Sequence, residues 1–305
     1  MDKVRKTPIV LITGSLGSGK TTLLRHMLEW APFRIAVLMN EFGETAIDSK
    51  IIGGKNIDIV ELAGGCVCCS MTGEFEAAVR EIIEAVAPGF IVVEATGVAE
   101  ADALVFEVED SLPEVRLDSV VCIVDAFLGT RHPHVGYSSR TQIASADIVL
   151  VNKADLVTSA ESDIIEAQVR KFNQRAAVLR TINCALDMNL IFGQAVAQER
   201  GRRASGRSES IPSSGAGELS SFVWTSERPL ESAKFDELVR RFPPGLIRAK
   251  GFILFEDAGR LFNYVAGRVD FEDFSVKRTE LVFIGRGMGE LRPGLEEELR
   301  NCRNA

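Results

Sequence analysis

The stretch Gly14-Ser15-Leu16-Gly17-Ser18-Gly19-Lys20-Thr21 decides the fold of this 305-residue chain. It follows the pattern G-x-x-x-x-G-K-[ST], comes after the apolar run 9–12, and precedes a helix-like segment, 22–30. Glycines let successive backbone N–H groups turn inward around an anion, and the following helix N-terminus adds partial positive charge. The stretch therefore predicts a P-loop that binds a nucleoside triphosphate.

The side chains of this loop have separate expected roles. Lys20 is expected to reach the β- and γ-phosphates and to act in catalysis, and the Thr21 hydroxyl is expected to ligate Mg²⁺. A plain glycine turn between a strand and a helix does not require Lys and Thr at these positions. The residues expected to bind the nucleotide here are Gly14, Gly17, Ser18, Gly19, Lys20, Thr21 and Thr22.

Composition and charge exclude several classes of protein. The net charge of -8 argues against a general binder of nucleic acid or of anionic membranes. No apolar run approaches the roughly 18 residues of a membrane span. The basic start of the chain runs into a first strand rather than a signal peptide, so we expect a cytoplasmic protein. The six cysteines are then expected to be thiols or metal ligands rather than disulfides.

The first 199 residues alternate between short apolar strands and amphipathic helices. Continuous apolar strands separated by helices predict an α/β P-loop domain with a mostly parallel sheet covered by helices. Strands are expected at 9–12, 34–39, 57–62, 90–93, 119–124 and 148–151. Helices are expected after the P-loop and around 75–86, 101–109 and 160–172.

The remainder of the chain differs in composition. Residues 200–220 are rich in Gly, Ser and Arg and nearly lack large apolar side chains, which predicts a flexible linker. Residues 221–305 contain short apolar strands interleaved with one or two helices. They are expected to form a small α+β domain.

The tetrapeptide Asn152-Lys153-Ala154-Asp155 follows a predicted buried strand. A carboxylate at Asp155 can accept hydrogen bonds from the N1–H and amino group of guanine, which adenine does not offer there. Lys153 would cover the face of the base, and Asn152 would tie the loop to the base. The same tetrapeptide is also consistent with a loop and a helix N-cap. Behind a P-loop, it predicts a guanine nucleotide.

Acidic residues follow two of the other strands. Glu94 ends the apolar strand 90–93, where P-loop proteins place an acidic residue that holds Mg²⁺, and Gly97 would let its N–H approach the γ-phosphate. The acidic loop Asn40–Glu44 follows strand 34–39 and is expected to be a switch segment beside the γ-phosphate. Glu41 is a candidate for positioning water. Glu94 is also consistent with a carboxylate at the N-terminus of a helix. The loop Asn40–Glu44 is also consistent with a solvated acidic turn.

The segment Gly64-Gly65-Cys66-Val67-Cys68-Cys69 is the most unusual feature of the chain. Three thiols within four residues suit Zn²⁺ or a related transition metal, and the two glycines allow the loop to curl around one ion. Three protein ligands leave one position open, as suits a metal that is passed on. A redox thiol cluster and simple packing are the alternatives.

Together these motifs resemble the CobW-type metallochaperone GTPases. The resemblance rests on Gly14–Thr21, Asn40–Glu44, Cys66–Cys69, Glu94–Gly97 and Asn152–Asp155. Arg248–Phe252 and Leu281–Gly285 resemble the C-terminal domain of that family. The sequence departs from the pattern of this family at two places. No histidine follows His134, whereas many members carry a histidine-rich stretch in or near the C-terminal domain. Met39 stands where some relatives carry a metal-binding glutamate.

The resemblance implies a slow, Mg²⁺-dependent GTPase that delivers a transition metal to a client protein. Zn²⁺ and Co²⁺ are the leading metals, with Ni²⁺ and Fe²⁺ still open, and a homo-oligomer is compatible with the family. The main alternative is a GTPase switch or assembly factor whose cysteines are structural or redox-active. A small-molecule kinase that uses the same P-loop is a further alternative.

Overall fold

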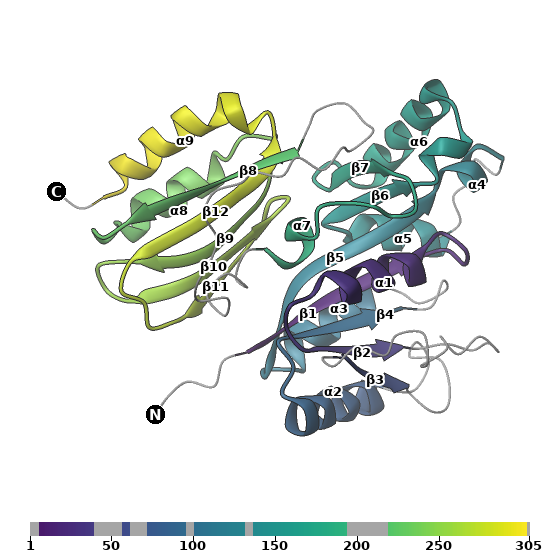
Figure 1. The fold of residues 1–305 in the computed structure, drawn as a ribbon, viewed down its shortest axis with the longest axis horizontal. Coiled ribbons are helices and arrows are strands. Elements are labelled where there is room, and N and C mark those ends of the chain that lie inside the picture. Colours follow the sequence, from purple (N-terminus) through teal and green to yellow (C-terminus); the bar gives the residue numbers. More distant parts are fainter. Residues whose placement is uncertain are drawn as a thin grey trace. The chain divides into compact units, whose positions relative to one another are not determined.

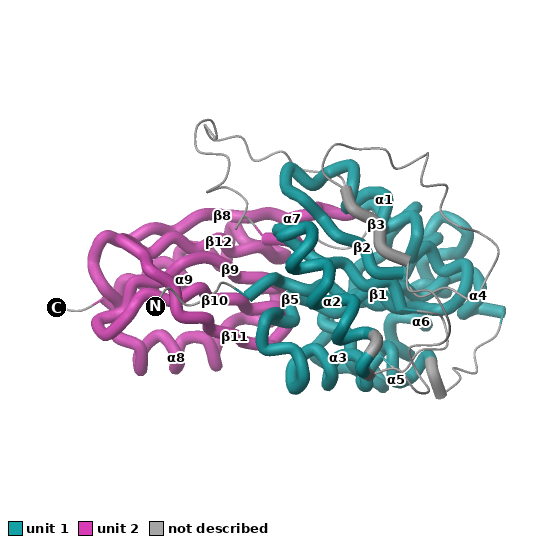
Figure 2. The backbone as a smooth tube through the Cα atoms, turned by 90° about the horizontal axis from the view of Figure 1, so that it is seen from below, with its two compact units in different colours: residues 1–185 teal, residues 186–305 magenta. Residues whose placement is uncertain are grey.

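The computed structural model describes residues 6–39, 57–61, 72–95, 101–131, 137–193 and 219–303. The chain forms two compact units, Met1–Ala185 and Leu186–Ala305, which are coloured separately in Figure 2. Each unit has its own sheet and hydrophobic core, so each is described by itself.

The first unit is built on a seven-stranded sheet in the order β3-β2-β4-β1-β5-β6-β7, and every strand pair in it is parallel. This confirms the predicted mostly parallel α/β sheet. β1 lies at the centre, so the residues that follow it stand between the ends of β4 and β5. The strands are β1 (Thr7–Gly14), β2 (Ile35–Met39), β3 (Ile57–Glu61), β4 (Phe90–Glu94), β5 (Val115–Asp125), β6 (Ile148–Asn152) and β7 (Ala177–Thr181).

Helices cover both faces of this sheet. In Figure 1, α1 lies in front of the strands, whereas α3 and α5 lie behind them. One core cluster joins β1, β2 and β4 to α2 and α3, and another joins β5 and β6 to α5 and α6. The helices are α1 (Lys20–Trp30), α2 (Thr72–Val86), α3 (Ala101–Asp110), α4 (Ala126–Arg131), α5 (Tyr137–Ser145), the single 3-10 turn η1 (Ala154–Leu156) and α6 (Ser159–Phe172).

β5 begins four residues before the predicted strand at 119–124. The added segment contains Arg116 and Asp118, which are both buried and form an ion pair at 2.8 Å. Because charged residues are expected at the surface, the hydrophobic pattern predicted a strand that begins only after this pair.

The second unit carries an antiparallel sheet in the order β11-β10-β9-β12-β8, packed against two long helices. This confirms the predicted small α+β domain. Its elements are α7 (Asn189–Phe192), β8 (Leu219–Ser226), α8 (Ser232–Arg240), β9 (Leu246–Leu254), β10 (Gly259–Val265), β11 (Arg268–Asp273), β12 (Thr279–Arg286) and α9 (Met288–Asn301). The short helix α7 belongs to this unit, although the sequence places residue 189 in the first domain.

Two cations on β9 hold α7 against this sheet. Arg248 is fully buried and donates to the carbonyl of Leu190 at 3.1 Å, and Lys250 donates to the carbonyl of Phe192 at 3.0 Å. Carbonyls at the C-terminal end of a helix lack intrahelical partners and carry partial negative charge. The two side chains therefore satisfy groups that α7 would otherwise bury unpaired.

Candidate nucleotide-binding site

The loop from Gly14 to Lys20 connects the central strand β1 to α1. Three of its glycines adopt positive φ: 140° at Gly14, 75° at Gly17 and 119° at Gly19. A Cβ atom on Gly14 would lie 2.4 Å from the carbonyl oxygen of Ile123, and one on Gly19 would lie 2.6 Å from Nδ2 of Asn152. Gly14 and Gly19 are thus required for both backbone angle and space.

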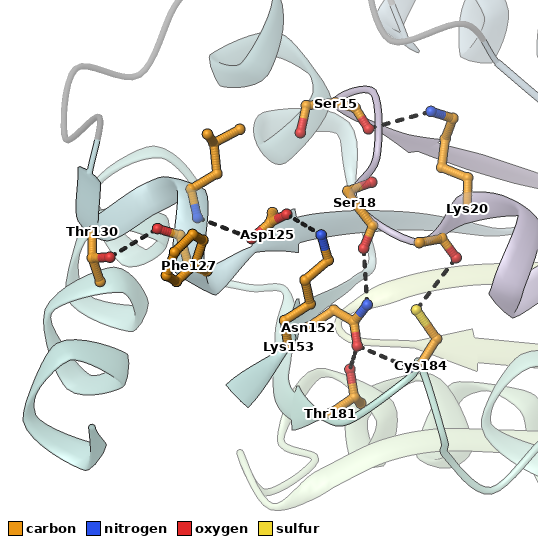
Figure 3. Close-up of polar contacts among 12 residues, drawn as sticks. Ser15, Ser18, Lys20, Asp125, Phe127, Thr130, Asn152, Lys153, Thr181 and Cys184 are labelled. Atoms are coloured by element: carbon orange, nitrogen blue, oxygen red, sulfur yellow. Dashed lines mark hydrogen bonds and ion pairs between the residues drawn. The ribbon is translucent and has the colours of Figure 1, made fainter. Parts of the chain in front are cut away.

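Lys20 is the first residue of α1 and is buried. Its Nζ donates to the carbonyl of Gly14 at 3.1 Å and to that of Ser15 at 3.3 Å, so the ammonium group lies across the loop (Figure 3). The hydroxyl of Ser18 is buried and has no hydrogen-bond partner in the part of the chain that the structure describes. The loop thus presents the ammonium group of Lys20 and the hydroxyl of Ser18, and these two groups fit a phosphate ligand.

Thr21 and Glu94 come from different elements and meet beside this loop. Thr21 is exposed on the first turn of α1, and its Oγ1 donates to Oε1 of Glu94 at 3.4 Å. Glu94 is buried at the end of β4, the strand that pairs with β1. A hydroxyl and a carboxylate are the oxygen ligands that Mg²⁺ uses in phosphate sites, so these two residues fit that ion.

Asn152 connects the P-loop to two further segments, as Figure 3 shows. Its Nδ2 donates to the carbonyl of Ser18 at 2.8 Å. Its Oδ1 accepts from the hydroxyl of Thr181 at 3.1 Å and from the backbone N–H of Cys184 at 2.8 Å. Because Asn152 is only 2% exposed, these bonds form away from water and fix the ends of β6 and β7 to the phosphate loop.

Cys184 is the residue that closes this network from the β7 side. Its φ is 55°, and its Sγ donates to the carbonyl of Gly19 at 3.4 Å. Burial raises the pKa of the Cys184 thiol to about 12, against a small opposing effect of Lys153. The thiol therefore stays protonated near neutral pH and serves as a packed donor rather than a nucleophile.

Lys153 and Asp155 lie directly after Asn152. Lys153 has a φ of 61° and precedes η1, on which Asp155 is exposed. The Nζ of Lys153 donates to Oδ2 of Asp125 at 2.5 Å. The sequence analysis does not identify Asp125 as a site residue. A signal for it is present, because Asp125 follows an apolar strand directly, as Glu94 does.

Several predicted site residues lie outside the described residues. They are Glu41, Cys66, Cys68, Cys69 and Gly97, together with the switch segment Asn40–Glu44 and the linker up to residue 218. Within the described ranges, no group of three or more His, Cys, Asp or Glu side chains could hold a metal ion. Nor do those ranges contain a helix long and apolar enough to cross a membrane.

Two family models match the chain. Residues 8–180 match the model described as "CobW/HypB/UreG, nucleotide-binding domain", and residues 219–303 match the "Cobalamin synthesis protein cobW C-terminal domain". The first match covers more than half of the chain and includes the P-loop, Glu94, Asp125 and the Asn152–Asp155 loop.

The chain is also similar to individual proteins. The zinc chaperone YjiA of Escherichia coli is 34% identical over 193 residues, which are 60% of this chain and 60% of YjiA. The zinc-regulated GTPase metalloprotein activator 1 of Dictyostelium discoideum is 24% identical over 379 residues, covering 97% of this chain and 80% of that protein. The crystal structure of Zn(II)-bound YjiA aligns with 98% of this chain and 100% of its own at 22% identity and a TM-score of 0.47.

Proposed function

This chain belongs to the family of CobW/HypB/UreG nucleotide-binding proteins, and from that premise we propose that it is a GTP-dependent metallochaperone. It binds GTP at the P-loop, holds a transition metal at Cys66, Cys68 and Cys69, and passes the metal to a client protein when GTP is hydrolysed. The observation that carries the proposal is the hydrogen-bonded link from the P-loop through Asn152 to the base-reading loop, in a chain that also has the C-x-C-C motif.

The nucleotide part of the proposal rests on the described geometry. Asn152 ties its loop to Ser18, which supports a site in which the base-reading loop is held at a fixed place relative to the phosphate loop. The exposed carboxylate of Asp155 is available to accept hydrogen bonds from a guanine edge. A site built for those donors rejects adenine, which lacks them.

The hydrolysis part assigns a resident Mg²⁺ to Thr21 and Glu94, whose side chains already meet. When bound, Mg²⁺ supplies charge neutralisation on the phosphate oxygens. Lys20 then binds the β- and γ-phosphates once its hydrogen bonds to the loop carbonyls are exchanged for the ligand. Glu41 stays our candidate for orienting the attacking water.

The metal part rests on the cysteine motif and on the names of relatives. Three thiolates form a borderline-soft donor set that suits Zn²⁺, and also Co²⁺. Relatives of this chain are named zinc chaperones, which favours Zn²⁺ as the cargo. Thiolates hold such an ion only while they stay reduced, so a cytoplasmic setting is part of the proposal.

The proposal is tested by titrating the full chain with Zn²⁺ in the presence of GTP. The variant in which Cys66, Cys68 and Cys69 are all replaced by Ser should lose tight Zn²⁺ binding and should keep the GTP affinity that the wild type has in the absence of Zn²⁺, because the thiolates contact the metal and not the nucleotide. Cys302→Ala is the matched control, since Cys302 is a buried thiol of the second unit. Equally tight Zn²⁺ binding by wild type and triple variant would contradict the proposal.

A further inference from the structure

We propose that Asp125 is a positioning residue for guanine recognition: it holds Lys153 in the orientation in which its side chain covers the base. This inference rests on the proposed function, because it deepens the account of the same nucleotide site. It assigns a role to a carboxylate that belongs to neither the P-loop nor the Asn152–Asp155 motif.

The register of the sheet places Asp125 beside the base-reading loop. Asp125 ends β5, Asn152 ends β6, and the two are direct partners in the parallel pair. Lys153 follows Asn152 with a φ of 61°, which turns the chain at the strand end. Its ammonium group then reaches across to Oδ2 of Asp125 at 2.5 Å.

The carboxylate is held at both of its oxygens. While Oδ2 accepts from Lys153, Oδ1 accepts from the backbone N–H of Leu128 at 2.9 Å, in the first turn of α4. Asp125 is 7% exposed, so its orientation is set by these two bonds rather than by water. A fixed acceptor of this kind restricts the rotamers of a flexible lysine.

The burial of Asp125 explains why its ion pair with Lys153 is stabilising. Asp125 lines a cavity of about 180 Å³ together with Ser15 of the P-loop and with both polar and apolar residues of β5, α4, α5 and α6. Because Asp125 is itself largely buried, a cationic partner stabilises the charge of its carboxylate. The Lys153 side chain, with 34% of its surface exposed, provides that partner from the solvent side.

Two anchors therefore position the loop that carries Asp155. Asn152 fixes the start of the loop to Ser18 of the P-loop, and Asp125 fixes the side chain of Lys153. With the ammonium group held at Asp125, the aliphatic stem of Lys153 is preorganised as one wall of the base site. Preorganisation of this kind raises affinity without adding a contact between Asp125 and the ligand.

The experiment measures GDP and ADP affinities by calorimetry for the wild type, for Asp125→Asn, for Lys153→Met, and for the double variant. Asparagine keeps an oxygen for the N–H of Leu128, and methionine keeps the aliphatic stem of the lysine. Each single variant should bind GDP roughly tenfold more weakly. The double variant should be no weaker than either single variant, because both remove the same interaction.

Controls separate this role from a general effect on folding. Glu166→Gln removes a similar ion pair, with Arg180 at 2.6 Å in the same unit, and should leave GDP affinity unchanged. Asp125→Ser is a second variant that also keeps an oxygen as cap for α4, and thermal melting checks that each variant is folded. The expected result is a loss of GDP affinity in variants that remain fully folded at the temperature of the titration.

Two results would overturn the inference. Additive losses in the double variant, roughly 100-fold in total, would mean that Asp125 acts independently of Lys153. Unchanged GDP affinity in Asp125→Asn would mean that the carboxylate is not needed. In either case a wild type that still prefers GDP to ADP leaves the proposed function standing, whereas a wild type without that preference overturns both.

Discussion

At the scale of single residues, the candidate site depends on one amide side chain. Asn152 bonds to the P-loop, to Thr181 and to the backbone of Cys184, and it is almost completely buried. Gly19 lies directly against it, because a Cβ atom at position 19 would approach both Nδ2 of Asn152 and, at 2.8 Å, the sulfur of Cys184. Nothing larger than glycine fits there without breaking the network.

Gly19→Ala should therefore lower GDP affinity at least tenfold and reduce the free energy of unfolding by about 2 kcal/mol, since it adds a strained positive φ to a steric clash. Calorimetric titration and urea unfolding measure the two effects. Gly73→Ala is the control, because Gly73 lies in α2, where an added Cβ atom would meet no heavy atom of the described residues within 4 Å. Equal behaviour of the two variants would rule out the steric account.

At the scale of helices and strands, the central part of the fold is predictable from the sequence. Continuous apolar runs indicate the strands that surround β1, and the fixed spacing of Gly, Lys and Thr indicates the turn into α1. These signals are local, because the strands next to β1 are apolar along their length and each glycine of the loop acts through its own backbone angles.

Other features depend on contacts between distant segments and leave no local signal. Arg248 and Lys250 are fully buried against α7, although charged residues in a strand ordinarily suggest an exposed face. The helix α9 continues through Pro293, a residue that normally ends a helix. Asp125 gains its role only because β5 and β6 are neighbours in the sheet.

Gly251 gives a prediction at this scale. Its φ is 153°, and a Cβ atom there would lie 2.0 Å from the carbonyl oxygen of Glu280 on the neighbouring strand β12. Gly251→Ala should lower the free energy of unfolding of the second unit by about 3 kcal/mol or more, because backbone cannot move aside as a side chain can. Chemical denaturation tests this when it is followed by the fluorescence of Trp224 in a Trp30→Phe background, because Trp30 lies in the first unit.

Gly289→Ala supplies the comparison for that experiment. Gly289 lies in α9, and a Cβ atom there would meet no heavy atom within 4 Å. Alanine there should be neutral or stabilising by up to about 1 kcal/mol, in line with helix propensity. A Gly251→Ala protein as stable as Gly289→Ala would show that β9 and β12 are not so closely packed.

At the scale of the whole molecule, the proposed function links two ligands. The cysteine motif lies in sequence between the switch segment Asn40–Glu44 and Glu94. The switch segment follows β2 and the cysteine motif follows β3. The carboxyl ends of β2, β3 and β4 lie at the same edge of this parallel sheet as the P-loop, which follows β1. Binding of the γ-phosphate can therefore be coupled to the arrangement of the three thiolates, and linkage makes that coupling reciprocal.

The most direct test of this central claim is competition for Zn²⁺ between a chelator of known affinity and the full chain. The chain is saturated either with a non-hydrolysable GTP analogue or with GDP, at matched Mg²⁺ concentrations. The account predicts that Zn²⁺ binds more tightly in the GTP-analogue state, by as much as roughly 150-fold for a coupling of about 3 kcal/mol. The same Zn²⁺ affinity in both nucleotide states would contradict it.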